Sequence, residues 1–238
     1  MHLSNPALNT PLTEQLATAE AALATYQQHR EDWQNKAAMV VKHQQAAEAA
    51  ESSAKGFKQQ ARAVLLSMMG KTPPKKMAEL RAEERAAYSL AEDFRYLTTE
   101  LELARDAAEI AMLEAGKAYL DAKNRTTQTL AEGRMQEALE QLGGLLSAMS
   151  LRRMVLQQPD QVAMWQAQGF DSAVAVVLAE VRKQLEQRLE QFTLGMSQEP
   201  ILQALPDDDG LNAASTISPL QLNRRRTELA QRQQEHAA

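Results

Sequence analysis

Residues 75–120 have the sequence KKMAELRAEERAAYSLAEDFRYLTTELELARDAAEIAMLEAGKAYL, in which apolar residues recur every three or four positions. No proline interrupts the chain from Lys75 to Gln158. This spacing predicts a long helix with a narrow apolar stripe on one face, formed by Met77, Leu80, Ala87, Ala91, Phe94, Leu101, Ala108, Met112 and Ala115. A helix of this length, rising about 1.5 Å per residue, cannot wrap around a compact centre. It must therefore bury its stripe against other long helices, from the same chain or from copies of it.

The composition agrees with a protein made of long helices. Only 4% of the 238 residues are aromatic, and there are no cysteines, so neither a thick globular core nor a disulfide framework is expected. The net charge of −5 does not favour general binding to nucleic acid. No apolar run is long enough to span a membrane, and the first residues do not resemble a secretory signal. The expected compartment is a cytoplasm.

The chain before this stretch predicts a second long helix. Residues 1–10 are expected to form a flexible tail, and Thr10-Pro11 has the pattern of a helix start. A strict alternation of four and three residues follows, which indicates a coiled coil, through Leu12, Leu16, Ala19, Leu23, Tyr26, Arg30, Trp33, Ala37 and Val40. Beyond Gly56 either a second helix or a kinked extension is expected. A turn at residues 70–74, Gly-Lys-Thr-Pro-Pro, would make residues 11–158 an antiparallel helical hairpin.

The remainder predicts a smaller C-terminal helical region over residues 159–238. A helix break is expected near Gly133 or at Gly143-Gly144, and residues 159–170 are expected to form a loop. Asp171-Ser172 should cap a helix with the stripe Val174, Leu178, Val181, Leu185, Leu189, Phe192 and Met196. Residues 197–218 are expected to be irregular, and Ser218-Pro219 should begin a last helix. The predicted fold class is therefore all-α: an elongated bundle of long helices, or coiled-coil strut, with this smaller region attached.

No stretch of the sequence carries a convincing catalytic or ligand-binding motif. Gly70-Lys71-Thr72 resembles the end of a phosphate-binding loop, but Pro73-Pro74 prevents the helix that must follow it. Asp207-Asp208-Asp209 lacks the spacing of a calcium loop, so a solvated acidic turn is expected. Solvated side chains without metal-binding spacing are expected for His2, His29, His43 and His236. We expect no catalytic residue, no cofactor, no metal and no enzymatic activity.

Two groups of residues are candidates for protein interfaces. Arg224-Arg225-Arg226 is an unusual basic cluster in an acidic chain. It is interpreted first as a solvated helix face, next as a contact with an acidic protein surface, and third as a nucleic-acid contact, which lacks interleaved aromatic residues. Trp165 and Phe170 are interpreted either as core residues or, if exposed, as interface anchors.

Residues 135–205 resemble a known family. The segments MQEALE (135–140), LLSAMSL (145–151), VLQ (155–157), VRKQLEQ (181–187) and EPIL (199–202) are similar to corresponding segments of the capsid size-determination protein Sid. Sid is the external scaffold that satellite phages use to redirect the capsid protein of a helper phage. The order of the helices is also similar along nearly the whole chain. A related capsid-decorating product, the polarity-suppression protein, has a similar long-helix character.

The resemblance implies an all-helical protein that assembles in many copies into a cage outside the procapsid, in the cytoplasm of the host bacterium. The cage would hold hexamers of the helper's major capsid protein and impose the curvature of a small shell. Residues 11–158 would form the strut and residues 159–238 the contacts with other copies and with the shell. No membrane partner is implied, and nucleic acid is not expected. A polarity-suppression type of decoration protein and a coiled-coil adaptor protein remain alternatives.

Overall fold

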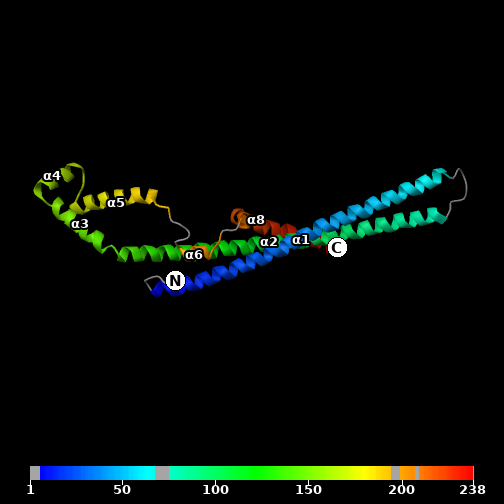
Figure 1. Cartoon of the computed structure of the whole chain (residues 1–238), viewed down its shortest axis with the longest axis horizontal. Coiled ribbons are helices and arrows are strands. Elements are labelled where there is room, and N and C mark those ends of the chain that lie inside the picture. The colour runs from blue at the N-terminus through cyan, green and yellow to red at the C-terminus, as the bar shows by residue number, and fades with distance from the viewer. Residues whose placement is uncertain (1–5, 68–74, 194–198, 207–208, 238) are drawn as a thin grey trace. The chain divides into compact units, whose positions relative to one another are not determined.

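The computed structural model of the chain describes residues 6–67, 75–193, 199–206 and 209–237, and these contain helices and no strand. The two longest helices are α1 (Pro6–Ser67) and α2 (Lys75–Glu140). They are followed by α3 (Gly143–Leu156), α4 (Pro159–Ala167), α5 (Ala173–Gln191), α6 (Pro200–Gln203), the 3-10 helix η2 (Asp209–Leu211), α7 (Asn212–Thr216) and α8 (Pro219–Ala237) (Figure 1). The predicted all-α class is confirmed.

The buried residues of α1 follow the predicted alternation of four and three. All nine predicted stripe positions from Leu12 to Val40 are buried or half-buried. The same spacing then continues through the alanines Ala47, Ala50, Ala54 and Ala61, all of them buried. Side chains this small let a neighbouring helix approach closely, so the Ala-rich segment takes part in the packing even though each residue buries little area.

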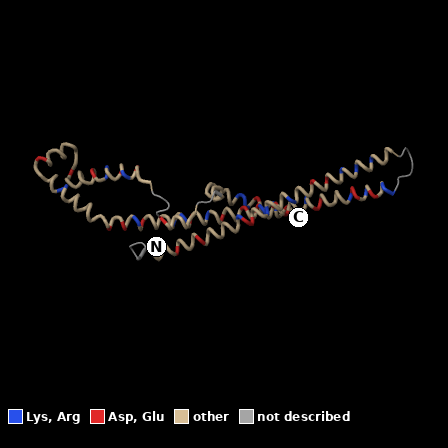
Figure 2. Tube along the Cα trace, viewed as in Figure 1, with Lys and Arg blue, Asp and Glu red and all other residues tan. Residues whose placement is uncertain are grey.

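The buried face of α2 has the same spacing. Met77, Leu80, Ala91, Ala108 and Met112 are buried, and the other four predicted stripe positions are half-buried. Opposite α1, the side-chain amide of Gln44 donates to Glu102 at 3.3 Å, and Arg95 is ion-paired with Glu51. The residue numbers run in opposite directions, so the two helices are antiparallel, as predicted. Acidic and basic residues are interspersed along both (Figure 2).

In the first half of the chain, the structure corrects one predicted helix boundary and chooses between the two alternatives given for another. Residues 6–10 are not part of a tail as predicted, because α1 begins at Pro6 and contains Pro11. A proline this close to the helix start removes only one backbone hydrogen bond, so the helix tolerates it. The chain is continuous through Gly56, which makes α1 a single helix. The predicted turn at 70–74 lies outside the described residues.

Two predictions for the C-terminal part were wrong. Residues 159–170 are not a loop, because Pro159 occupies the first turn of α4, where proline is tolerated. The segment 197–218 is not irregular throughout, since it contains α6, η2 and α7. By contrast, Ser172 caps α5 as predicted, its Oγ accepting the amide of Ala175 at 3.2 Å. α2 continues through Gly133, and the helix break falls just before Gly143-Gly144, one of the two predicted positions.

The internal contacts divide the chain into two units. The first unit consists of residues 1–20 and 121–207, and the second of residues 21–120 and 208–238. α3, α4 and α5 therefore belong to the first unit, and η2, α7 and α8 to the second. The functional division of the chain at residue 158 stays a prediction.

Candidate functional site

The last helix, α8, has little apolar surface with which to pack. Leu222 is buried, while Leu229 and His236 are half-buried. These three residues are spaced seven apart, so they lie on one narrow face, with a single residue for every two turns. Burial of so few side chains is a weak attachment for a helix of 19 residues.

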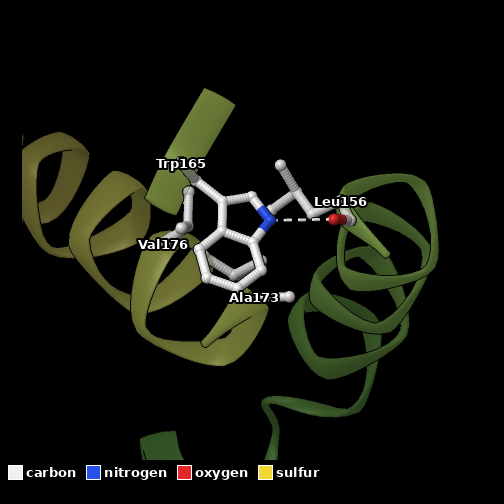
Figure 3. Close-up of a cluster of buried hydrophobic side chains, with 5 residues drawn as sticks. Leu156, Trp165, Ala173 and Val176 are labelled. Carbon is white, nitrogen blue, oxygen red and sulfur yellow. Dashed lines mark hydrogen bonds between the residues drawn. The ribbon is translucent and has the colours of Figure 1, made fainter. Parts of the chain in front are cut away.

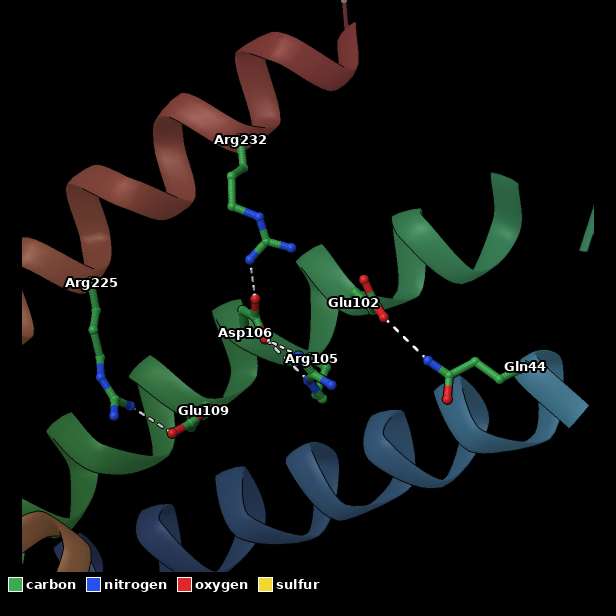
Figure 4. Close-up of polar contacts among 7 residues, drawn as sticks. All are labelled: Gln44, Glu102, Arg105, Asp106, Glu109, Arg225 and Arg232. Atoms are coloured by element: carbon green, nitrogen blue, oxygen red, sulfur yellow. Dashed lines mark hydrogen bonds and ion pairs between the residues drawn. The ribbon is translucent and has the colours of Figure 1, made fainter. Parts of the chain in front are cut away.

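Ion pairs to α2 supply the rest of the attachment. The Nη1 of Arg225 lies 2.6 Å from Glu109 Oε1, and Arg232 is paired with Asp106 (Figure 4). Arg226 is paired with Glu114. Near the end of the helix, the ring of His236 lies 5.1 Å from that of Tyr96, centroid to centroid. The partners on α2 run backwards in number, so α8 lies antiparallel to it. These contacts hold Arg225, Arg226 and Arg232 to an acidic row within their own unit.

The three consecutive arginines are consequently not equivalent. Each residue of a helix is rotated by about 100° from its neighbour, so a run of three cannot face one surface. Arg224 points away from α2: its side chain is 81% exposed, and its Nε lies 2.7 Å from Glu228 of the same helix. Contact of these arginines with a partner protein stays a prediction, and Arg224 is the member of the three that is available for it.

The segment before α8 is positioned by a close approach at Gly116. A Cβ placed on Gly116 would lie 2.7 Å from the Cβ of Ala214 and 3.3 Å from the ring of Tyr26. Ala214 in α7 and the neighbouring Leu211 are both buried. Only glycine allows α7 to lie this close to α2. Sequence reasoning missed this contact, although an isolated glycine inside a strong helical pattern is its signal.

In the first unit, Trp165 belongs to a core rather than to the surface. The residue is 9% exposed, and its indole Nε1 donates to the carbonyl oxygen of Leu156 at 2.9 Å (Figure 3). The other members of this cluster are Leu156, Ala173, Val176 and Val177, with Phe170 half-buried against it. Of the two roles predicted for Trp165, this packing corresponds to the core role. A contact of Phe170 with a partner stays a prediction.

Three ion pairs, one of Arg152 and two of Arg134, support the same unit. Arg152 of α3 lies 2.8 Å from Glu180 of α5, and its hydrogen bond lowers the pKa of that carboxyl group. Arg134 of α2 binds both Glu137 and Glu199 at 3.0 Å, and these hydrogen bonds raise the pKa of the guanidinium. The pair with Glu199 holds the start of α6, whose Ile201 packs with Leu12 and Leu130.

The predicted stripe of α5 is not its buried face. The buried residues are Ala173, Val176 and Val177, whereas the stripe residues Leu185, Leu189 and Phe192 are 56%, 72% and 64% exposed. The first half of the helix packs on α3 and α4, and every residue from 182 to 193 is exposed. An amphipathic helix is thus present as predicted, but the large apolar side chains of its second half face solvent.

The described residues offer no cluster of metal ligands. None of their His, Asp and Glu side chains form a group of three that could hold a metal ion. The expectation of solvated histidines is wrong for His43 and His236, which are half-buried with their ring centroids 5.7 Å from that of Phe94 and 5.1 Å from that of Tyr96. His29 is half-buried as well, and His2 lies outside the described residues. No helix in the described ranges combines the length and hydropathy that crossing a membrane requires.

Comparison with known proteins gives one structural likeness. No family model matches the sequence. A search of curated proteins finds no match either. Among solved structures, the chain is similar to a chain of the structure described as "Satellite phage P4 procapsid including size determination (Sid) protein", with a TM-score of 0.81 and 20% sequence identity. The match covers 95% of this chain and 97% of that chain. At this identity the likeness establishes a Sid-like fold, which confirms the predicted resemblance at the level of structure.

Proposed function

We propose that this chain, with its Sid-like fold, is an external scaffolding protein that directs a helper phage's major capsid protein into smaller shells. The observation that carries the proposal is the fold match, which extends over 95% of the chain. The proposed partners are hexamers of the capsid protein and further copies of this chain. The proposed place of action is the outer surface of procapsids in the host bacterial cytoplasm.

The physical character of the molecule supports this function. Its two longest helices have 62 and 66 residues and would each extend about 90–100 Å at 1.5 Å per residue. They pack against each other through regularly spaced apolar faces, and a helix pair of this kind suits a spacer that holds its binding partners at a fixed distance. Imposing curvature on a shell needs no reaction. It needs stiff elements and many weak contacts repeated by symmetry, which together bias the assembly although none is strong alone.

The exposed face of α8 supports a contact with a protein partner. Arg224 is the one of the three consecutive arginines that α2 does not engage, so it is free to meet an acidic surface of the shell or of another copy. We assign Phe170 a lesser role, because half of it already packs against the core around Trp165.

Co-expression with the major capsid protein of a candidate helper phage, followed by electron microscopy, tests the proposal. The expected result is a population of smaller shells that is absent when the capsid protein is expressed alone. Arg224→Glu should reduce that population while leaving the ion pairs between α8 and α2 intact, with Lys58→Glu, at an exposed position of α1, as a matched control. Shells of unchanged diameter would overturn the proposal. If the protein coated such shells, it would be a decoration protein, and if it ignored them, an adaptor.

A further inference from the structure

The exposed apolar stripe of α5 has a symmetry that points to a specific partner. We propose that α5 pairs with α5 of a second copy of this chain, antiparallel, about a two-fold axis near residue 183. The inference rests on the proposed function in that a cage needs contacts between copies, and it names one of those contacts.

The first observation is that the apolar residues of the stripe are placed nearly symmetrically about residue 183. Val174 and Phe192 are each nine residues from position 183, and Val181 and Leu185 are each two residues from it. Leu178 and Leu189 are five and six residues away, on opposite sides. In an antiparallel pair centred at 183, Val174 would meet Phe192, Val181, which is half-buried against the cluster around Trp165, would meet Leu185, and Leu178 and Leu189 would lie within one residue of each other. A two-fold contact requires this kind of self-complementary surface.

The second observation is a groove where this register needs one. A cavity of about 150 Å³ lies between α3 and α5 and is lined by Leu146, Met149, Ser150, Arg153, Val174 and Val177. The groove lies at Val174, which is the position opposite Phe192 of the second copy. An aromatic side chain that fills an apolar pocket is the usual anchor of a protein interface.

The third observation is complementary charge at the same place. Arg153 lines the groove and has no ion pair within the described ranges, and Glu190, next to Leu189, has none either. In the antiparallel register Glu190 of the second copy lies opposite residue 176, beside the groove. Close to the axis, Arg182 lies 2.7 Å from Glu186 of its own helix, so the two copies of Arg182 do not meet as bare like charges.

Sedimentation velocity of the full-length protein, without capsid protein, tests the contact. The wild type should associate reversibly. Leu185→Asp combined with Leu189→Asp should raise the dissociation constant by about tenfold or more, since truncating a central anchor residue costs over 1 kcal/mol. Both positions are exposed, so helix content measured by circular dichroism should not change. Leu66→Asp, at a 75% exposed leucine of α1, is the control and should leave the dissociation constant within about twofold, as expected of an isolated surface residue.

Cross-linking tests the direction of pairing. Because the chain has no cysteine, Leu178→Cys and Leu189→Cys each introduce a single thiol. Antiparallel pairing predicts a disulfide when the two variants are mixed and little when either is oxidised alone. Disulfides within each single variant would instead indicate parallel helices and would overturn the register.

A charge exchange tests the groove. Arg153→Glu and Glu190→Arg should each weaken association, and the double variant should recover it. Failure to recover would overturn the placement of Glu190 at the groove.

The outcomes separate this contact from the proposed function. A wild type that is monomeric at every concentration overturns the contact. This result is also expected if the apolar stripe of α5 packs against Met135 and Leu139 of α2 in the same chain. If such a monomer still yields small shells on co-expression, the proposed function stands without it. If the protein pairs as described but leaves the shell diameter unchanged, the α5 contact stands and the proposed function is overturned.

Discussion

Two helices of equal length, α5 and α8, behave in opposite ways. Each has 19 residues. α8 is the more polar of the two, yet along its whole length it is attached to α2 by Arg225, Arg226, Arg232 and His236. α5 carries the longer apolar stripe, yet its second half is exposed on every side. Apolar content alone therefore does not decide which helix is covered in the monomer.

What decides it is the surface that each helix meets within its own unit. Along one face of α2, Asp106, Glu109 and Glu114 are placed to receive arginines, so a polar helix docks there. Among the residues that the structure describes, no matching apolar row covers the second half of α5. A covered polar helix indicates an internal attachment, whereas an uncovered apolar helix indicates a contact still to be made.

The largest expected difference between α5 and α8 comes from removing the core contact that holds the first half of α5. Trp165→Ala deletes the central side chain of the α3–α5 core and should lower its local stability by about 3–5 kcal/mol. Amide hydrogen exchange should accelerate in α3, α4 and α5, while α8 keeps its protection. Equal loss of protection in both helices would mean that the two units do not unfold separately.

A smaller effect is expected at the close approach that positions α7 and α8. Gly116→Ala would place a methyl group 2.7 Å from the Cβ of Ala214, which should destabilise this packing by about 1–3 kcal/mol. The matched control is Gly56→Ala, where no atom lies within 4 Å and the same change should stabilise helix α1 by about 0.5–1 kcal/mol. Thermal denaturation should shift in opposite directions. A shift in the same direction would contradict the contact.

The ion pairs of α8 should have a moderate combined effect that depends on salt. Replacing Arg225, Arg226 and Arg232 together by alanine should weaken the docking of α8 by about 1–2 kcal/mol, since exposed pairs contribute about 0.2–1 kcal/mol each. The wild type should approach the variant near 1 M salt, where the Debye length is about 3 Å. Hydrogen exchange of residues 219–237 measures both. Arg224→Ala is the control, and an equal loss there would show that the pairs to α2 do not hold the helix.

The smallest effect is a pH dependence of α5. Hydrogen bonding from Arg152 lowers the pKa of Glu180 below its ordinary value of 4.5. The stabilisation is therefore fully present above pH 4.5 and is lost as the pH falls through the lowered pKa of the folded state. Both side chains are about half exposed, so the expected loss is about 0.2–1 kcal/mol. Exchange in α3 and α5 should report it, and Glu180→Gln should remove that part of the pH profile.

Much of the architecture follows from the sequence because it depends on local spacing. The alternation of three and four fixed the buried faces of α1 and α2, and the pattern at Ser172 predicted the cap that the structure shows. The errors have local causes as well. Residues 159–170 were expected to form a loop although proline suits the first turn of a helix, and the buried face of α1 continues beyond the predicted stripe through Ala47, Ala50, Ala54 and Ala61.

The features of the candidate site likewise separate into those set by local spacing and those set by tertiary contacts. The sequence by itself determined that residues 219–237 form a helix with an arginine cluster and that α5 has an apolar stripe, because side-chain spacing along one helix sets both. Only the tertiary structure decided that Arg225 meets Glu109, more than a hundred residues away in the chain, and that Val176 rather than Leu189 lies in the core. Spacing within a helix fixes which residues share a face, but the element that covers that face is chosen by distant parts of the chain.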